Sequence, residues 1–166
     1  MLKDFKSNWD IQKNWQLIFP FLGILGLGYS SFKFGLKFTN SYSIFFTIGL
    51  SALFFFILLK LILFFFKKLE NKWIVDFRWE MIRIFIVFAI TGSSSVFVGQ
   101  PIIKLIGITK ENLNPVLYWI LFISIGLIFY QILLVTFGWL FGQHKFFWEF
   151  EKKMLRRFGL GKFIDK

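Results

Sequence analysis

Four long apolar runs alternate with short polar or charged segments along the chain. They cover about residues 15–32, 42–66, 82–103 and 116–141. A helix rises about 1.5 Å per residue, so about 20 apolar residues cross the ~30 Å hydrocarbon core of a bilayer. The pattern therefore predicts an all-α membrane protein with four transmembrane helices.

A different pattern follows the fourth run. Phe147, Phe150, Met154 and Phe158 recur at helical spacing, and basic residues occupy positions between them. The basic residues are Lys145, Lys152, Lys153, Arg156 and Arg157. An apolar stripe flanked by cations is typical of a helix that lies in the plane of the membrane interface. We expect such an amphipathic helix at about residues 145–158, with its cations on anionic lipid head groups.

Basic residues are unevenly distributed among the segments that flank the runs. Lys and Arg number 20 against 9 Asp and Glu, which gives a net charge of +11. Three basic residues precede the first run and seven follow the fourth, against four in the other two loops. Five more lie between the second and third runs or at the start of the third: Lys67, Lys68, Lys72, Arg78 and Arg83. Because short basic loops stay in the cytoplasm, both termini are expected there. The chain then divides into a first segment with one hairpin, residues 1–66, and a second, residues 67–166.

The composition excludes several functional classes. With 57% hydrophobic residues, including 27 Phe and 7 Trp, the chain is too apolar for a soluble enzyme of 166 residues. It has no cysteine, and its apolar runs lack Asp and Glu, so neither thiol chemistry nor a carboxylate-based proton path is expected. We find no phosphate-binding loop or metal-ligand motif, and we expect no metal or cofactor. The positive charge clusters at predicted membrane edges, which favours anionic lipid over nucleic acid.

The second half carries most of the distinctive polar residues. A cluster of small residues lies near the middle of the third run, close to the bilayer midplane: Thr91, Gly92, Ser93, Ser94, Ser95 and Gly99. Small residues let helix backbones approach closely. The favoured interpretation is helix packing, with hydroxyls bonded to their own backbone, and the alternative is a substrate or ion site.

Gln131 lies at a similar depth in the fourth run. A side-chain amide in hydrocarbon requires a partner, and a hydrogen bond there contributes on the order of 1 kcal/mol. We therefore predict that Gln131 bonds to a hydroxyl of the small-residue cluster: Thr91, Ser93, Ser94 or Ser95.

His144 is the only histidine, and it lies at the predicted inner interface. It has no neighbouring acid or thiol, so the sequence favours no catalytic residue. Arginines on the same predicted face could hold a phospholipid phosphate with it, since guanidinium offers paired donors. They are Arg78, Arg83, Arg156 and Arg157. Ordinary positive-inside charge is the favoured interpretation of these arginines.

Three stretches resemble a known family: Phe88–Ser95, Leu105–Ile108 and Phe137–Trp148. The resemblance covers about residues 72–159. It is to small uncharacterised bacterial inner-membrane proteins that are sometimes labelled prolipoprotein diacylglyceryl transferase-like. That label implies transfer of a diacylglyceryl group from phosphatidylglycerol to a lipoprotein cysteine. The Gly- and Asn-rich signature of established transferases does not occur in this sequence.

The expected function is that of a non-catalytic, multi-pass protein of the bacterial inner membrane. Small-residue faces and Phe-rich surfaces suit packing against other integral membrane proteins, which favours an accessory or assembly subunit of a larger complex. The expected partners are those proteins and membrane lipids, especially anionic phospholipid. The alternatives are a lipid-handling enzyme that uses His144 with nearby arginines, and a small transporter with a polar path through the small-residue cluster and Gln131.

Overall fold

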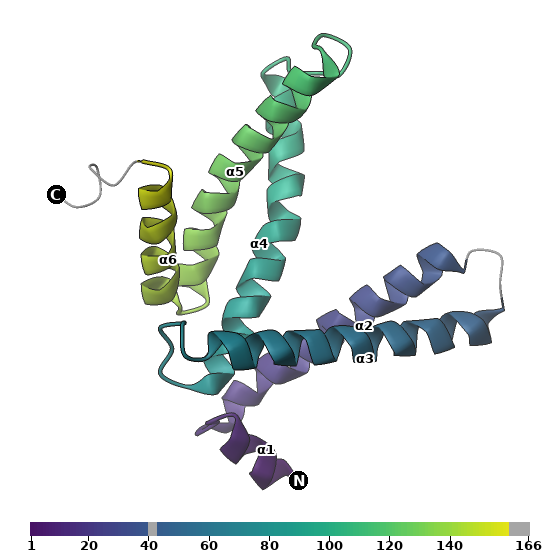
Figure 1. Cartoon of the computed structure of the whole chain (residues 1–166), viewed down its shortest axis with the longest axis vertical. Helices are drawn as coiled ribbons and strands as arrows, with labels where there is room; N and C mark the ends of the chain where they lie inside the picture. The colour runs from purple at the N-terminus through teal and green to yellow at the C-terminus, as the bar shows by residue number, and fades with distance from the viewer. Residues whose placement is uncertain (40–42, 160–166) are drawn as a thin grey trace. The chain divides into compact units, whose positions relative to one another are not determined.

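The computed structural model describes residues 1–39 and 43–159, and 81% of these residues are helical. No strand occurs among the described residues, which confirms the all-α prediction. The helices are α1 (Leu2–Asn8), the 3-10 helix η1 (Asn14–Leu17), α2 (Ile18–Phe38), α3 (Ile44–Leu69), α4 (Arg78–Leu105), α5 (Pro115–Leu140) and α6 (His144–Arg157) (Figure 1). Within the described ranges, η1 with α2, and α3, α4 and α5, make four helices long and apolar enough to cross a membrane, as the four runs predicted.

The chain forms two compact units, Met1–Arg83 and Ile84–Lys166. The boundary falls inside α4 because the first turns of that helix pack on the N-terminal segment. The backbone N–H of Trp79 donates to the carbonyl of Trp9 at 3.0 Å. The Trp79 side chain is 3% exposed and stacks on Phe19, with 5.4 Å between ring centroids. The start of α4 is therefore part of the first unit.

In the first unit, α2 and α3 form an antiparallel pair joined by small residues. Gly35 of α2 lies so close to α3 that a Cβ placed on it would be 2.1 Å from Ser51 Oγ. One turn further along, the hydroxyls of Thr39 and Thr47 are hydrogen-bonded at 2.7 Å. We call these four residues, Gly35, Thr39, Thr47 and Ser51, the hydroxyl seam. Their small size brings the two helix backbones together.

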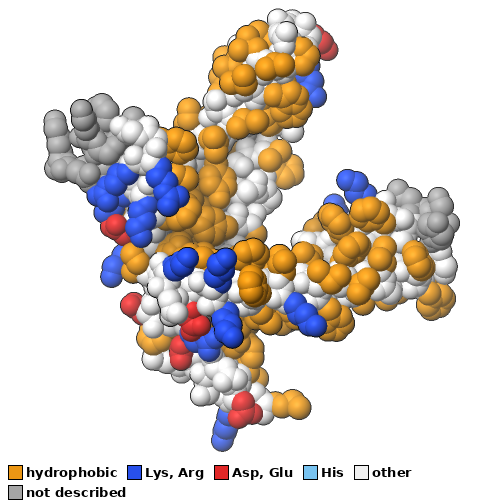
Figure 2. Space-filling view, in the orientation of Figure 1, with side chains coloured by type: hydrophobic (Ala, Val, Ile, Leu, Met, Phe, Trp, Pro, Cys, Tyr) orange, Lys and Arg blue, Asp and Glu red, His pale blue; other side chains and the backbone are white. Residues whose placement is uncertain are grey.

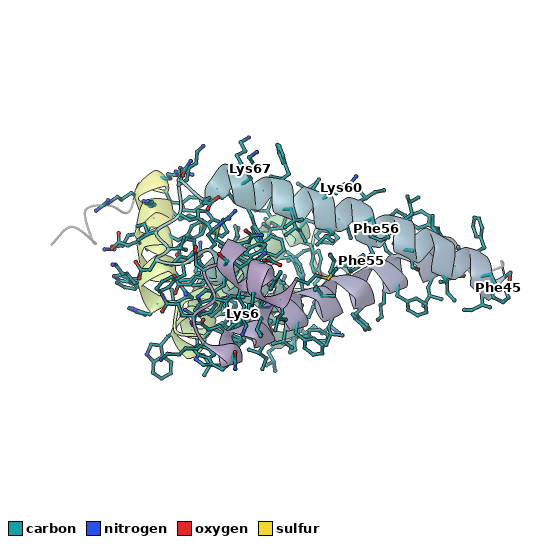
Figure 3. All side chains as sticks on the ribbon, turned by 90° about the horizontal axis from the view of Figure 1, so that it is seen from below. Lys6, Phe45, Phe55, Phe56, Lys60 and Lys67 are labelled. Atoms are coloured by element: carbon teal, nitrogen blue, oxygen red, sulfur yellow. The ribbon has the colours of Figure 1, made fainter. Side chains whose placement is uncertain are left out.

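The outer surface of this helix pair is apolar. Phe45 and Phe56 of α3 are 82% and 61% exposed (Figure 3). Hydrophobic side chains cover most of the visible surface of α2 and α3 (Figure 2). Lys60 is also exposed on α3, and its aliphatic stem can carry the ammonium toward the membrane interface. Such a surface suits hydrocarbon.

Candidate functional site

A tight turn joins α5 to α6 in the second unit and brings α6 back beside the end of α5 (Figure 1). Helix α5 ends at Leu140, and Gly142 has a φ of +68, in the left-handed region that glycine adopts without strain. The backbone N–H of Gln143 then donates to the carbonyl of Gly138 at 2.7 Å. The glycines of this segment therefore build a helical hairpin.

Helix α6 packs on α5 through Phe147. This side chain is fully buried against the bare backbone of Gly138, where a Cβ would lie 2.5 Å from Phe147 Cδ2. From α4, the ring of Phe88 lies 5.2 Å from that of Phe147 and 5.4 Å from that of Phe150, between centroids. The apolar stripe that we expected to face lipid thus lies partly inside the second unit, whereas Phe158 is 64% exposed.

The buried face of α6 also holds a carboxyl group. Glu151 is 3% exposed. With its amide nitrogen turned toward this group, Gln131 of α5 donates to both carboxyl oxygens, at 3.1 Å to Oε2. Burial raises the pKa of Glu151 to about 7. The predicted hydrogen bond from Gln131 to the small-residue cluster is therefore wrong, because the amide faces a carboxyl group of α6 instead.

No role for Glu151 was predicted from the sequence. The available signal was its spacing, because Glu151 follows Phe147 by four residues and precedes Met154 by three. Residues three or four apart share one face of a helix. An acidic residue on the apolar stripe, rather than between stripe and solvent, indicates a specific partner.

Two hydroxyls of the small-residue cluster bond to the backbone of their own helix, α4, whereas the buried hydroxyl of Thr91 has no hydrogen-bond partner among the described residues. The hydroxyl of Ser93 donates to the carbonyl of Ala89, and that of Ser95 to the carbonyl of Gly92, both at 3.0 Å. Beyond this cluster, α4 and α5 enclose an apolar groove of about 210 Å³. The residues that line it include Ser95, Gly99, Ile103, Phe122, Gly126 and Tyr130. No charged side chain of the described residues lines the groove, so its character is that of a packing surface.

Cations cover the exposed face of α6. Lys145, Lys153 and Arg157 are exposed, and none of them forms an ion pair within the described ranges. Lys152 pairs with Glu149. The exposed face of α6 is therefore strongly positive.

His144 begins α6 and is exposed. Its ring stacks on that of Trp148, with 5.9 Å between centroids and 13° between planes. In the part of the chain that the structure describes, no group of three or more His, Cys, Asp and Glu side chains could hold a metal ion. The contact of His144 is thus an aromatic one, which suits a membrane interface.

Residues 83–162 match a family model described as "Family of unknown function (DUF6787)". The match covers just under half of the chain, and it begins at Arg83, where the two units meet in sequence. Searches of curated proteins and of solved structures found no match. The hairpin, the groove and the basic helix all lie within the matched residues, and no comparison links the chain to a diacylglyceryl transferase.

Two arginines suggested as lipid ligands have protein partners in the first unit. Arg78 pairs with Glu70 at 2.7 Å and donates to the carbonyl of Asn8 at 2.8 Å. Arg83 pairs with Glu80 at 3.1 Å and is 9% exposed. Its guanidinium also lies 4.6 Å from the ring centroid of Trp79. Both guanidinium groups are therefore engaged by carboxylates of the first unit.

Proposed function

We propose that this chain is a non-catalytic, multi-pass protein of the bacterial inner membrane, with both termini in the cytoplasm, that serves as an accessory or assembly subunit of a larger complex. The observation that carries this proposal is the exposure of its apolar helices. In the most apolar stretches of α3 and α5, 6% of the residues are buried. Surfaces of this kind require hydrocarbon or other helices around them.

The groove between α4 and α5 favours a helix of another protein, in addition to lipid, as a neighbour of these exposed apolar surfaces. Gly99, Gly126 and Ser95 line it. In membranes, small residues at a helix surface allow the close backbone approach that gives extensive van der Waals contact. The absence of charge along the described lining fits an apolar transmembrane helix of a partner.

Affinity purification of the full chain in mild detergent tests the accessory role. We expect another integral membrane protein in near-stoichiometric amount. Gly126→Leu fills the groove, and a loss of ~1.4 kcal/mol in association would lower recovery of the partner about tenfold. Gly92→Leu is the matched control, because Gly92 also has open space around it and does not line the groove. Recovery of the chain alone under all mild conditions would contradict the proposal.

We further propose that α6 lies at the cytoplasmic interface with its cations on anionic head groups. Each basic residue near an anionic leaflet contributes about 1 kcal/mol. Replacing three exposed cations, Lys145, Lys153 and Arg157, by glutamine is expected to remove most of the enrichment of anionic phospholipid in polymer-extracted nanodiscs, as measured by lipid analysis.

The matched control for this experiment replaces three cations of the opposite predicted side, Lys33, Lys37 and Lys104. This variant has the same net charge as the α6 variant, and we expect it to keep the lipid enrichment, because the positive-inside rule places these residues away from the cytoplasmic leaflet. Equal losses in the two variants would count against the proposed orientation.

A lipid-handling enzyme is the main alternative. It requires His144 and several arginines around one phosphate, yet Arg78 and Arg83 are paired with carboxylates. Loss of a lipid-transfer activity in His144→Ala would favour this alternative. A transporter requires a polar path through the membrane, and the groove beside Ser95 is apolar.

A further inference from the structure

Glu151 lies on the buried face of α6 without a cationic partner among the residues that the structure describes. None of the ion pairs among the described residues involves it. Helix α5 contains no Asp, Glu, Lys or Arg, and toward Glu151 it presents the amide of Gln131 and the phenol of Tyr130. The part of α4 in this unit has one charged residue, Lys104, in its last turn. On α6 itself, the adjacent Lys152 pairs with a different carboxylate.

These surroundings fit the neutral form of the carboxyl group. A buried carboxylate without a cation is costly, whereas a carboxylic acid both donates and accepts hydrogen bonds. Turned over, the same amide presents its oxygen to the carboxyl group, where it accepts the O–H of the acid, whereas its nitrogen donates to the ionised form. Gln131 is therefore a complementary partner for protonated Glu151.

We propose that Glu151 is a proton-binding site that controls the docking of α6: the protonated carboxyl holds α6 against α5, and its ionisation favours release of the helix. On release, α6 rotates about Gly142. This movement uncovers Phe147 and the face of α5 at Gly138. The inference concerns α5 and α6 alone, so it goes beyond the accessory role and does not depend on it.

The direction of the pH effect follows from the buried carboxyl. Burial gives Glu151 a pKa of about 7, above the ordinary 4.5 of a solvated glutamic acid. Well below pH 4.5 the group is neutral whether α6 is docked or released, so docking is at full strength. As the pH rises from 4.5 to about 7, the released form ionises first, and the docking equilibrium falls by about two orders of magnitude. At higher pH both forms are ionised, and the docking equilibrium falls no further.

Pulsed electron paramagnetic resonance on the full chain in nanodiscs tests the proposal. The chain has no cysteine, so two can be added for spin labels without removing any. Ile132 of α5 and Lys153 of α6 are exposed and carry the labels. We expect one short distance at about pH 5, and a second, longer population that grows toward about pH 8.5.

Glu151→Gln is neutral at every pH and should keep the short distance throughout. Glu149→Gln is the matched control on the exposed side of the same helix, and it should keep the shift. His144→Gln should also keep it, which separates the effect of Glu151 from any effect of the one histidine in the sequence. An unchanged distance in the natural sequence, or a shift that survives Glu151→Gln, would overturn the proposal.

A second measurement applies if Glu151→Gln does not fold. Glu151→Met is also neutral and has a similar volume, but it leaves the Gln131 amide without this partner, so docking should weaken by the same amount at both pH values and show no pH dependence. Infrared titration of the natural sequence requires no variant at all, and a protonated carboxyl band should persist up to about pH 6. Absence of that band above about pH 5 would refute the proton site. Neither result bears on whether the chain has a partner protein.

Discussion

Replacing Gly138 by alanine is expected to destabilise the docked hairpin of α5 and α6 by about 3 kcal/mol. The added Cβ would lie 2.5 Å from Cδ2 of Phe147 and 2.8 Å from its Cβ and Cγ. Rotation of the ring can move Cδ2, but the Cβ of Phe147 is fixed to the backbone of α6. The whole helix therefore has to shift. Unfolding of the full chain by SDS titration from mild detergent measures the loss.

Gly126 provides the matched control on the same helix. A Cβ at this position meets no atom within 4 Å, so Gly126→Ala should stabilise the chain by up to about 1 kcal/mol, because glycine is unfavourable inside a helix. Adding Phe147→Leu to Gly138→Ala should recover about 1 kcal/mol, since the two sites are in contact. If Gly138→Ala proved as stable as the natural chain, the close packing of the hairpin would be disproved.

The four spans could be predicted because each is long and almost free of charge. The fourth was expected at about 116–141 and is Pro115–Leu140 in the structure. The largest difference is at the first span, expected to end at about residue 32, where α2 continues through Lys33 and Lys37 to Phe38. Hydropathy marks where a helix leaves hydrocarbon, whereas backbone hydrogen bonds let the helix continue into water.

The partner of Gln131 could not be predicted from its depth in the membrane. Its position along α5 matches that of the small-residue cluster, but depth does not specify the face to which a side chain turns. The face is decided by the return of α6, which depends on the turn at Gly142 and the contact at Gly138. In sequence, an apolar stripe that meets protein looks the same as one that meets lipid. Glu151, four residues after Phe147, distinguishes the two cases, because an acidic residue on the apolar stripe indicates a protein partner.

In the first hairpin too, the contact between helices could not be predicted from the sequence of either helix alone. Most distinctive polar residues lie in the second half of the sequence, yet the hydroxyl seam of α2 and α3 is buried in the first. Thr39 and Thr47 are 3% exposed, and Ser51 is 8% exposed. The spacing of four residues from Gly35 to Thr39 and from Thr47 to Ser51 is the small-xxx-small signal that could have found it. Their pairing across two helices is a tertiary property that one helix alone does not show.

Replacing Gly35 by leucine is expected to separate α2 from α3 at a cost of about 3 kcal/mol or more. Even a Cβ would lie 2.1 Å from Ser51 Oγ and 3.3 Å from the carbonyl oxygen of Thr47. That oxygen belongs to the backbone, so no side-chain rotation removes the contact. Gly28→Leu on the same helix is the matched control, because a Cβ at Gly28 meets no atom within 4 Å. We expect it to change the unfolding free energy by less than about 1 kcal/mol.

Variants of Ser51 distinguish the contact of Gly35 with the Ser51 hydroxyl from its other contacts with α3. Its hydroxyl is buried and has no hydrogen-bond partner within residues 1–39 and 43–159, so Ser51→Ala alone should cost little. In Gly35→Ala the nearest atom is that hydroxyl oxygen, and its removal should restore about 1 kcal/mol or more. The contacts at 3.3 Å remain and should keep the double variant below the natural chain in stability. Strictly additive effects of the two substitutions would show that α2 and α3 do not approach each other at Gly35, since only residues in contact share an interaction energy of this size.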